Sequence, residues 1–249
     1  MVILVEQKFA IITDIHGNNA ALSAVLNDID CDPNINHIYC LGDLIGIGHE
    51  TNEVLDQLFS RNDIIYVIGN HDEAVLDILS GKEPESVGEE REHHQWVAAG
   101  LSSEFLPKLQ NMPKEHRETI AGKKCRFIHY HMDQNLHFLP IDHRPTIDRL
   151  DELYQDAPAD IICFGHHHFI HHFRSNQGLY INPSSLGCHQ HPLAPYAKVK
   201  IGESGEIDVS FIEVPYDNKA FLLQFEKENV PAKDFILKNF YGNQHLDFI

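Results

Sequence analysis

Aspartate, histidine and asparagine side chains recur in this sequence directly after short apolar runs. Seven of them stand out: Asp14, His16, Asp43, Asn70, His129, His166 and His168. Carboxylate and amide oxygens are hard donors, imidazole is a borderline donor, and the set contains no thiolate. Such a mixture suits manganese, iron or zinc better than Ca²⁺ or Cu⁺. The residue types alone therefore predict a transition-metal site.

Spacing supports this interpretation at two places. Asp14 and His16 are separated by one residue, as are His166 and His168, so in extended chain both members of a pair can point at one target. An isolated D-x-H motif is weak, because aspartate at a strand end is usually a turn former or a helix cap. The whole ordered set, each member just after an apolar run, has no economical structural explanation.

The elements that must position these side chains are alternating strands and helices. The apolar run 9–13 is followed by a polar stretch and then by Leu22, Val25, Leu26 and Ile29 at helical spacing. The same strand, loop and helix pattern recurs from residue 38 and again from residue 64. Three such units imply an α/β sheet covered by helices, with ligands bound at the carboxyl ends of its strands.

The rest of the chain adds hairpins and two helical segments. Paired strands are predicted within 118–129, 169–181 and 196–214, around turn residues rich in glycine. A helical insertion is predicted at about 81–112 and a helical C-terminal segment at about 217–249. We expect one domain spanning 1–249.

Read in order, the motifs resemble those of a known family. They are DIH at 14–16, GD at 42–43, GNHD at 69–72, His129 and GHHH at 165–168. This series resembles the calcineurin-like metallophosphoesterases, whose pattern is D-x-H, G-D, G-N-H-[DE], H and G-H-x-H. The resemblance covers about residues 8–187 and includes NPSSLG at 182–187. It implies a four-layer αββα sandwich of two mixed sheets flanked by helices.

The resemblance also implies roles for individual residues. One cation is expected on Asp14, His16, Asp43 and His168, and a second on Asp43, Asn70, His129 and His166. Asp43 would then bridge two transition-metal ions per chain, with manganese and iron as first choices and zinc as the alternative. A hydroxide between the metals would be the nucleophile, and His71 would be the general acid.

Contacts to the substrate are less well defined by the sequence. Asn18, His131 and His167 are the candidates, because polar groups near two metals are placed to bind phosphate. Each has a second interpretation: Asn18 as a helix cap, and the two histidines as residues that support the ligands or face solvent. Asp72 is read as structural, since an acidic residue at a helix start suits the helix dipole.

The expected activity is hydrolysis of a phosphoric ester. GDLIGIG lacks the second acidic residue and the arginine of G-D-x-x-D-R-G, the element of the family's protein phosphatases, and resembles a bacterial phosphodiesterase-like branch instead. A phosphodiesterase or a dinucleoside polyphosphate hydrolase is therefore the first hypothesis. A phosphomonoesterase or protein phosphatase on the same site, and a metal-binding regulatory module without catalysis, are the alternatives.

The amino-acid composition limits which molecules this protein is expected to bind and where it is expected to work. The 249 residues carry a formal net charge of −18, which disfavours long nucleic acid and anionic membranes and leaves a small phosphorylated substrate. Five scattered cysteines without C-x-x-C fit a reducing cytoplasm. The apolar stretch 1–5 is too short for a leader or a membrane helix. Phenylalanines in 217–249 indicate packing over a sheet edge or a contact between two copies.

Overall fold

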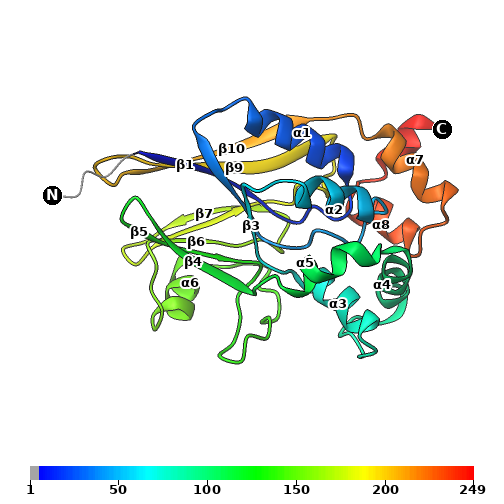
Figure 1. Cartoon of the computed structure of the whole chain (residues 1–249), viewed down its shortest axis with the longest axis horizontal. Coiled ribbons are helices and arrows are strands. Elements are labelled where there is room, and N and C mark those ends of the chain that lie inside the picture. The colour runs from blue at the N-terminus through cyan, green and yellow to red at the C-terminus, as the bar shows by residue number, and fades with distance from the viewer. Residues whose placement is uncertain (1–5) are drawn as a thin grey trace.

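Two five-stranded sheets pack face to face in the computed structural model, which describes residues 6–249 (Figure 1). The stretch 1–5 lies outside the described residues. The first sheet has the order β10, β9, β1, β2, β3, with β1 at Gln7–Ile12, β2 at Ile35–Cys40, β3 at Ile64–Tyr66, β9 at Leu193–Ile201 and β10 at Ile207–Pro215. The second has the order β4, β5, β6, β8, β7, with β4 at Glu115–Ile120, β5 at Lys123–Ile128, β6 at Ile161–Cys163, β7 at Ile170–Arg174 and β8 at Leu179–Pro183.

Both sheets are mixed. Strands β1, β2 and β3 are parallel, as are β5, β6 and β8. The other pairs are antiparallel, and they include the predicted hairpins β4–β5, β7–β8 and β9–β10. The parallel strands of each sheet carry their loops to the same end, which is the end where metal ligands were expected.

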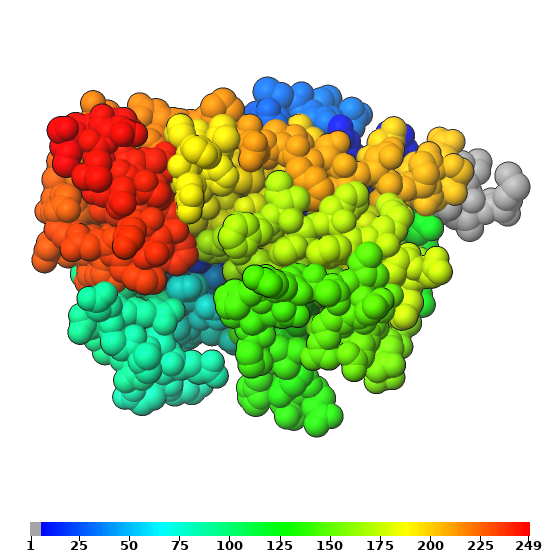
Figure 2. Space-filling model, turned by 180° about the vertical axis from the view of Figure 1, so that it is seen from behind, coloured from blue at the N-terminus to red at the C-terminus, as the bar shows by residue number. Residues whose placement is uncertain are grey.

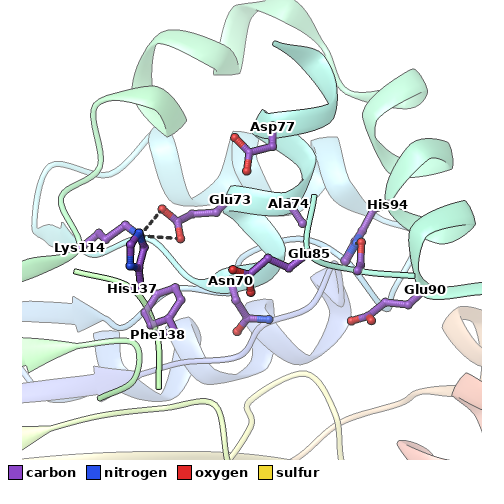
Figure 3. A pocket seen from close by; sticks show the side chains of 11 residues that line it. Asn70, Glu73, Ala74, Asp77, Glu85, Glu90, His94, Lys114, His137 and Phe138 are labelled. Carbon is purple, nitrogen blue, oxygen red and sulfur yellow. Dashed lines mark hydrogen bonds and ion pairs between the residues drawn. The ribbon is translucent and has the colours of Figure 1, made fainter. Parts of the chain in front are cut away.

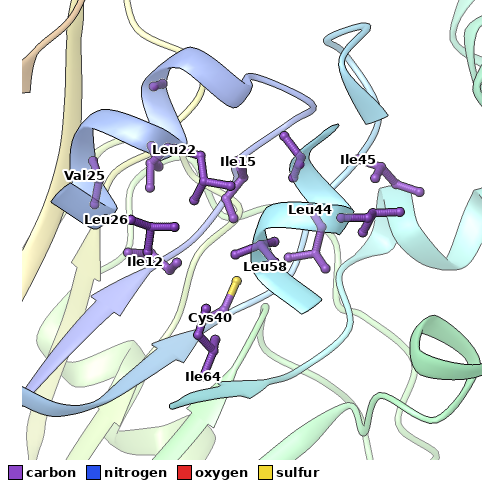
Figure 4. Packing of buried hydrophobic residues seen from close by; sticks show 14 of the residues in the cluster. Ile12, Ile15, Leu22, Val25, Leu26, Cys40, Leu44, Ile45, Leu58 and Ile64 are labelled. Atoms are coloured by element: carbon purple, nitrogen blue, oxygen red, sulfur yellow. The ribbon is translucent and has the colours of Figure 1, made fainter. Parts of the chain in front are cut away.

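Helices complete the predicted four layers. Helices α1 (Asn19–Asp30) and α2 (Thr51–Phe59) cover the outer face of the first sheet, and α6 (Ile147–Tyr154) covers the second (Figure 1). Leu22, Val25 and Leu26 of α1 pack on Ile12 and Cys40 of the sheet (Figure 4). Their recurrence every three or four residues is what buries one face of this helix.

A separate apolar cluster lies between the sheets. Phe9 and Tyr39 of the first sheet meet Phe127 of the second, and the rings of Tyr39 and Phe127 stack with centroids 3.7 Å apart. Strands whose two faces are both buried read as continuous apolar runs, as β1 and β6 do. The α/β sandwich of two mixed sheets predicted from the sequence is confirmed.

The remaining helices gather at one end of the sandwich (Figure 1). They are α3 (Asn70–Leu79), α4 (Gly88–Gly100), α5 (Leu106–Gln110), α7 (Lys219–Lys227) and α8 (Lys233–Asn239). Phe221, Phe225 and Ile236 of α7 and α8 form a small core with Ile47, which belongs to the loop after β2. The C-terminal segment is thereby attached to the loops at the strand ends. Among the described residues, no helix is long and apolar enough to cross a membrane.

Candidate metal centre

Loops at the carboxyl ends of the parallel strands place the seven predicted ligands. Asp14 and His16 follow β1, Asp43 follows β2, and Asn70 opens α3 after β3. In the second sheet His129 follows β5, and the pair His166 and His168 follows β6. Because the two sheets face each other, these loops approach from both sides.

Four of the side chains form a first group. His16 Nε2 lies 3.0 Å from His168 Nε2, 3.7 Å from Asp14 Oδ1 and 3.8 Å from Asp43 Oδ2. His168 Nε2 also lies 3.2 Å from Asp14 Oδ1. This is the set of four that the resemblance to the family implied for one cation.

The second group is built around His129. Its Nε2 lies 2.9 Å from Asn70 Oδ1 and 3.2 Å from Asp43 Oδ2. Donor atoms of Asp43, His129 and His166 all fall within 4.8 Å of one another. The same Asp43 Oδ2 atom therefore faces both groups.

These spacings fit metal coordination. Bonds of about 2.1 Å to nitrogen and oxygen place neighbouring ligands about 3.0 Å apart at right angles and about 3.4 Å apart in a tetrahedron. The six separations given above run from 2.9 to 3.8 Å and so bracket those values. Asp14 and Asp43 are also completely buried, and the ionisable side chains within 4.0 Å of their carboxylates are histidines. Two buried carboxylates need compensating positive charge, which bound cations would supply.

A surrounding layer of hydrogen bonds orients the donors. His129 Nδ1 lies 2.8 Å from the Leu41 carbonyl oxygen, so Nδ1 carries the proton and Nε2 is left as a donor to metal. Asp14 Oδ2 accepts from the Thr13 hydroxyl, which leaves Oδ1 facing the histidines. Asp43 Oδ1 accepts from the His71 backbone N–H at 2.9 Å, which leaves Oδ2 in the shared position.

The backbone is strained at this centre. Five of the seven predicted ligands have positive φ: Asp14, His16, Asp43, His166 and His168. Residues other than glycine rarely adopt this conformation, and each costs of order 1–3 kcal/mol. Such strain persists only where the surrounding structure imposes it, and it clusters at functional sites.

The loop 182–187 imposes much of that geometry. Ser185 Oγ donates to the Asp14 carbonyl oxygen at 2.7 Å, and the Gly187 N–H donates to the same oxygen at 3.0 Å. Ser184 Oγ donates to the His168 carbonyl oxygen. The loop thus connects the ligand segment of the first sheet to that of the second.

We expect Gly187→Ala to destabilise the protein by about 3 kcal/mol or more and to reduce metal content. A Cβ at this position would lie 1.7 Å from the Ile15 carbonyl oxygen, so the segment that carries Asp14 and His16 must move. Thermal unfolding and metal analysis measure both effects. Gly100→Ala, with nothing within 4 Å of its added Cβ, is the matched control and should keep wild-type values for both.

His71 lies next to these groups without being one of the seven. One of its ring nitrogens is within 4.8 Å of donor atoms of His16 and Asp43. Its Nδ1 lies 2.7 Å from His94 Nε2, and His94 Nδ1 lies 2.9 Å from Ser86 Oγ. His94 and Ser86 lie in the segment predicted as a helical insertion, and the sequence alone did not mark them as site residues. The signal available was the pair of adjacent histidines, His93 and His94, in that segment.

The three candidate substrate contacts are buried and bonded within the protein. Asn18 caps α1 by accepting from the Ala21 N–H, and its amide donates to the Gly187 carbonyl oxygen. His131 Nδ1 lies 2.6 Å from the Tyr154 hydroxyl. His167 contacts the Tyr130 hydroxyl and His171. These contacts favour supporting roles for all three.

Asp72 has the structural role read from the sequence. Its carboxylate accepts from the backbone N–H groups of Gly69, Leu44 and Ile45, so it joins the loop after β2 to the start of α3. Burial raises the pKa of Asp72 to about 7, and the nearby Asp43 carboxylate adds to the effect.

The sequence and fold of this chain are similar to those of known proteins. A family model described as the calcineurin-like phosphoesterase superfamily domain matches residues 8–203. The chain belongs to the calcineurin-like phosphoesterase superfamily. The resemblance predicted from the sequence motifs is confirmed at this level, and the chain is a hydrolase of phosphoric esters from a family that uses divalent metals.

Individual proteins are also similar to this phosphoesterase over part or most of the chain. An uncharacterized protein of Methanocaldococcus jannaschii is 30% identical over 250 residues, 92% of this chain and 96% of the relative. A symmetrical bis(5′-nucleosyl)-tetraphosphatase of Paracidovorax citrulli is 31% identical over 122 residues, 47% of this chain and 42% of the relative. The crystal structure of a metallophosphoesterase from Sphaerobacter thermophilus shares the fold, with a TM-score of 0.70 at 21% identity over 92% of this chain and 96% of that one.

The charge state of the phosphoesterase centre sets a pH dependence. Burial disfavours the charged form of His129, but the carboxylates of Asp43 and Asp14 and the hydrogen bond to Leu41 together outweigh burial and raise the pKa of His129 to about 9 in the metal-free protein. A metal can bind His129 only after that proton leaves. We expect the affinity for Mn²⁺ to rise about tenfold per pH unit between pH 7 and 8 and to level off above about pH 9.

Calorimetric titration of metal-free protein with Mn²⁺ measures this dependence. Repeating it at pH 7 in two buffers of different ionisation enthalpy should show about one proton released from His129 per bound pair of ions. An affinity that is independent of pH between 7 and 9 would contradict the assignment of His129 as a ligand.

Three cavities border the centre of the phosphoesterase. One of about 370 Å³ contains Asn70 and the carboxylates of Glu73, Glu85 and Glu90, with Lys114 bound to Glu73 (Figure 3). A second, of about 430 Å³, contains His168. The third, of about 780 Å³, contains His71. Seen from behind, the surface is hollowed between the C-terminal segment, the insertion and the loop after β5 (Figure 2).

Proposed function

We propose that this chain is a phosphodiesterase that uses two metal ions to hydrolyse small phosphate diesters. The observation that carries the proposal is the arrangement of two donor groups around the single atom Asp43 Oδ2, with His71 beside them. Two bound cations acidify water, hold phosphoryl oxygens and neutralise charge that builds on them during in-line attack.

The chain's own residues hold the donors and supply a proton donor. The hydrogen bonds from Thr13, Leu41 and the loop 182–187 fix the donor atoms before substrate arrives. His71 Nδ1 is bonded to His94, so His71 Nε2 is the nitrogen available to a leaving oxygen. When the Ser86 hydroxyl donates to His94 Nδ1, the proton of His94 lies on Nε2 and is donated in a hydrogen bond to His71 Nδ1. The proton of His71 then lies on Nε2.

Space around the centre favours a diester over a monoester. A phosphate held by the two donor groups has cavities beside Asn70, beside His168 and beside His71. Both ester substituents of a small diester therefore have room on different sides. A monoester would use one of the three cavities, whereas a diester would use two.

A dinucleoside polyphosphate hydrolase is the second candidate, and the tetraphosphatase of Paracidovorax citrulli favours it. The residues that line the three cavities argue against a polyphosphate substrate. Among the described residues that line the three cavities, Lys114 is the one lysine or arginine, and Glu73 pairs with it. Several linked phosphates would meet carboxylates instead of cations, which is unfavourable in an acidic protein.

A substrate panel tests the proposal. Metal-free protein is loaded with Mn²⁺, Fe²⁺, Zn²⁺ or Mg²⁺ and assayed with bis(p-nitrophenyl) phosphate, p-nitrophenyl phosphate, diadenosine tetraphosphate and a phosphopeptide. We expect the diester to be hydrolysed and the phosphopeptide to be left intact. Failure to hydrolyse any diester with any of the four metals, or preferred turnover of the phosphopeptide, would overturn the proposal.

A further inference from the structure

Three segments that are far apart in the sequence expose apolar side chains around the cavity beside His71. Val87 stands before helix α4, Ile141 lies in the loop after β5, and Phe235 lies on α8. Phe240 also lines this cavity, which we call the apolar chamber. Its volume of about 780 Å³ lies within the range of small-molecule sites, about 300–1,000 Å³.

The exposed apolar side chains of the chamber are not needed to hold their helices in place. Ile236 and Leu237 anchor α8 in the C-terminal core, while Phe235 next to them is 56% exposed. Val97 and Ala98 anchor α4 in the same way, and Val87 is 70% exposed. Exposed apolar groups gathered around one hollow mark a binding site rather than a packing need.

The charges of the apolar chamber define what it accepts. Among the described residues that line it, the formal charges are Glu89 and Glu90, and no lysine or arginine is present. Burial lowers the pKa of His93 and of His94 to about 4, so both rings are neutral at pH 7. An anionic group such as a second phosphate is disfavoured here, whereas an uncharged ring can pack on Phe235 and Phe240.

We propose that the apolar chamber binds the leaving group of the substrate, and that this group is an uncharged aromatic unit of nucleoside size on a diester with one phosphate. The proposal rests on the proposed phosphodiesterase function. It follows from His71, which lines the chamber and also lies beside the metal-ligand groups. The alcohol that receives the His71 proton must therefore extend into the chamber.

Hydrolysis of the diester beside His71 exchanges one bond to phosphorus for another. A water oxygen forms a bond to phosphorus, and the bond between phosphorus and the leaving oxygen breaks. The leaving oxygen keeps that electron pair and takes the proton of His71 Nε2. The proton released by the attacking water restores His71, and the products are a free nucleoside-like alcohol and a phosphate monoester.

Two substrates with similar alkoxide leaving groups test the assignment. Adenylyl-adenosine carries one phosphate and an aromatic base on each side, whereas diglycerol phosphate carries small polar groups. We expect Phe235→Ala to lower kcat/KM for adenylyl-adenosine at least tenfold, mainly through KM, and to change kcat/KM for diglycerol phosphate less than twofold. Leu246→Ala removes a similarly exposed side chain outside the chamber and should change neither value.

A binding measurement does not depend on turnover. Adenosine, the released alcohol, is titrated by calorimetry into wild type and Phe235→Ala. Measurable binding that weakens at least tenfold in the variant supports the chamber as its site. No binding to wild type, or equal binding to both proteins, overturns it.

The outcomes separate the two proposals. Hydrolysis of both diesters with an unchanged ratio in Phe235→Ala overturns the chamber proposal and leaves the phosphodiesterase intact. Absence of all diester hydrolysis overturns the phosphodiesterase, and the chamber's role in catalysis falls with it. A wild-type dimer that Phe235→Ala dissociates, seen by light scattering, would assign the chamber to contact between two copies and overturn the proposal.

Discussion

Asp43→Asn is expected to abolish hydrolysis, with a fall of about 10³-fold or more, and to leave less than one tightly bound metal ion per chain. One oxygen of Asp43 faces His16 at 3.8 Å and His129 at 3.2 Å, so both donor groups depend on the same carboxylate. An amide cannot offset the repulsion between two cations. The stabilisation that metals give to a phosphoryl transition state is several kcal/mol, and each 1.36 kcal/mol is tenfold in rate.

Metal analysis after dialysis and turnover of bis(p-nitrophenyl) phosphate measure the two effects together. Asp77→Asn is the matched control, because Asp77 is a carboxylate on α3 that lines the cavity beside Asn70 but is not one of the seven predicted ligands. Circular dichroism shows whether the variant folds. A folded Asp43→Asn protein that keeps two tightly bound ions would contradict the shared-ligand role.

The seven predicted ligands could be picked out from the sequence because strand ends are easy to locate in an α/β chain. Apolar runs such as 9–13 and 38–41 marked the strands, and the donors follow them directly. Parallel strands deliver those loops to one end of a sheet, so local pattern predicts long-range proximity. The hairpins were predictable for a similar reason, since turn residues lie between alternating runs.

The environment of His71 was less predictable because it depends on tertiary packing. His94 is 23 residues from His71 and sits on a helix whose position no local pattern fixes. Asn18 illustrates the opposite difficulty. A polar residue beside the ligands can be read as a substrate contact or as a cap, and burial in the folded protein favours the cap. The roles of individual residues such as His94 and Asn18 could therefore be assigned only from the folded structure.

His71→Asn is expected to lower kcat for bis(p-nitrophenyl) phosphate by about 10²-fold to 10⁴-fold while metal content stays at the wild-type value. In the proposed mechanism His71 Nε2 faces the leaving oxygen, whereas the predicted ligand atoms come from other side chains. Kinetics and metal analysis on the same preparation separate the two roles. A parallel loss of metal would show that His71 is a ligand, and unchanged kcat would remove it from proton transfer.

Variants of His94 should give a smaller effect of the same kind, because His94 acts through His71. The 2.7 Å contact fixes the ring orientation and the proton position of His71, so His94→Ala should lower kcat about tenfold to 10²-fold with little change in KM. Glutamine can place an amide N–H near the position of Nε2, and His94→Gln should recover part of the loss. In the double variant with His71→Asn, removal of His94 should cost nothing further, since its effect requires the ring that it positions. Additive losses in that double variant would instead mean that His94 contacts the substrate directly.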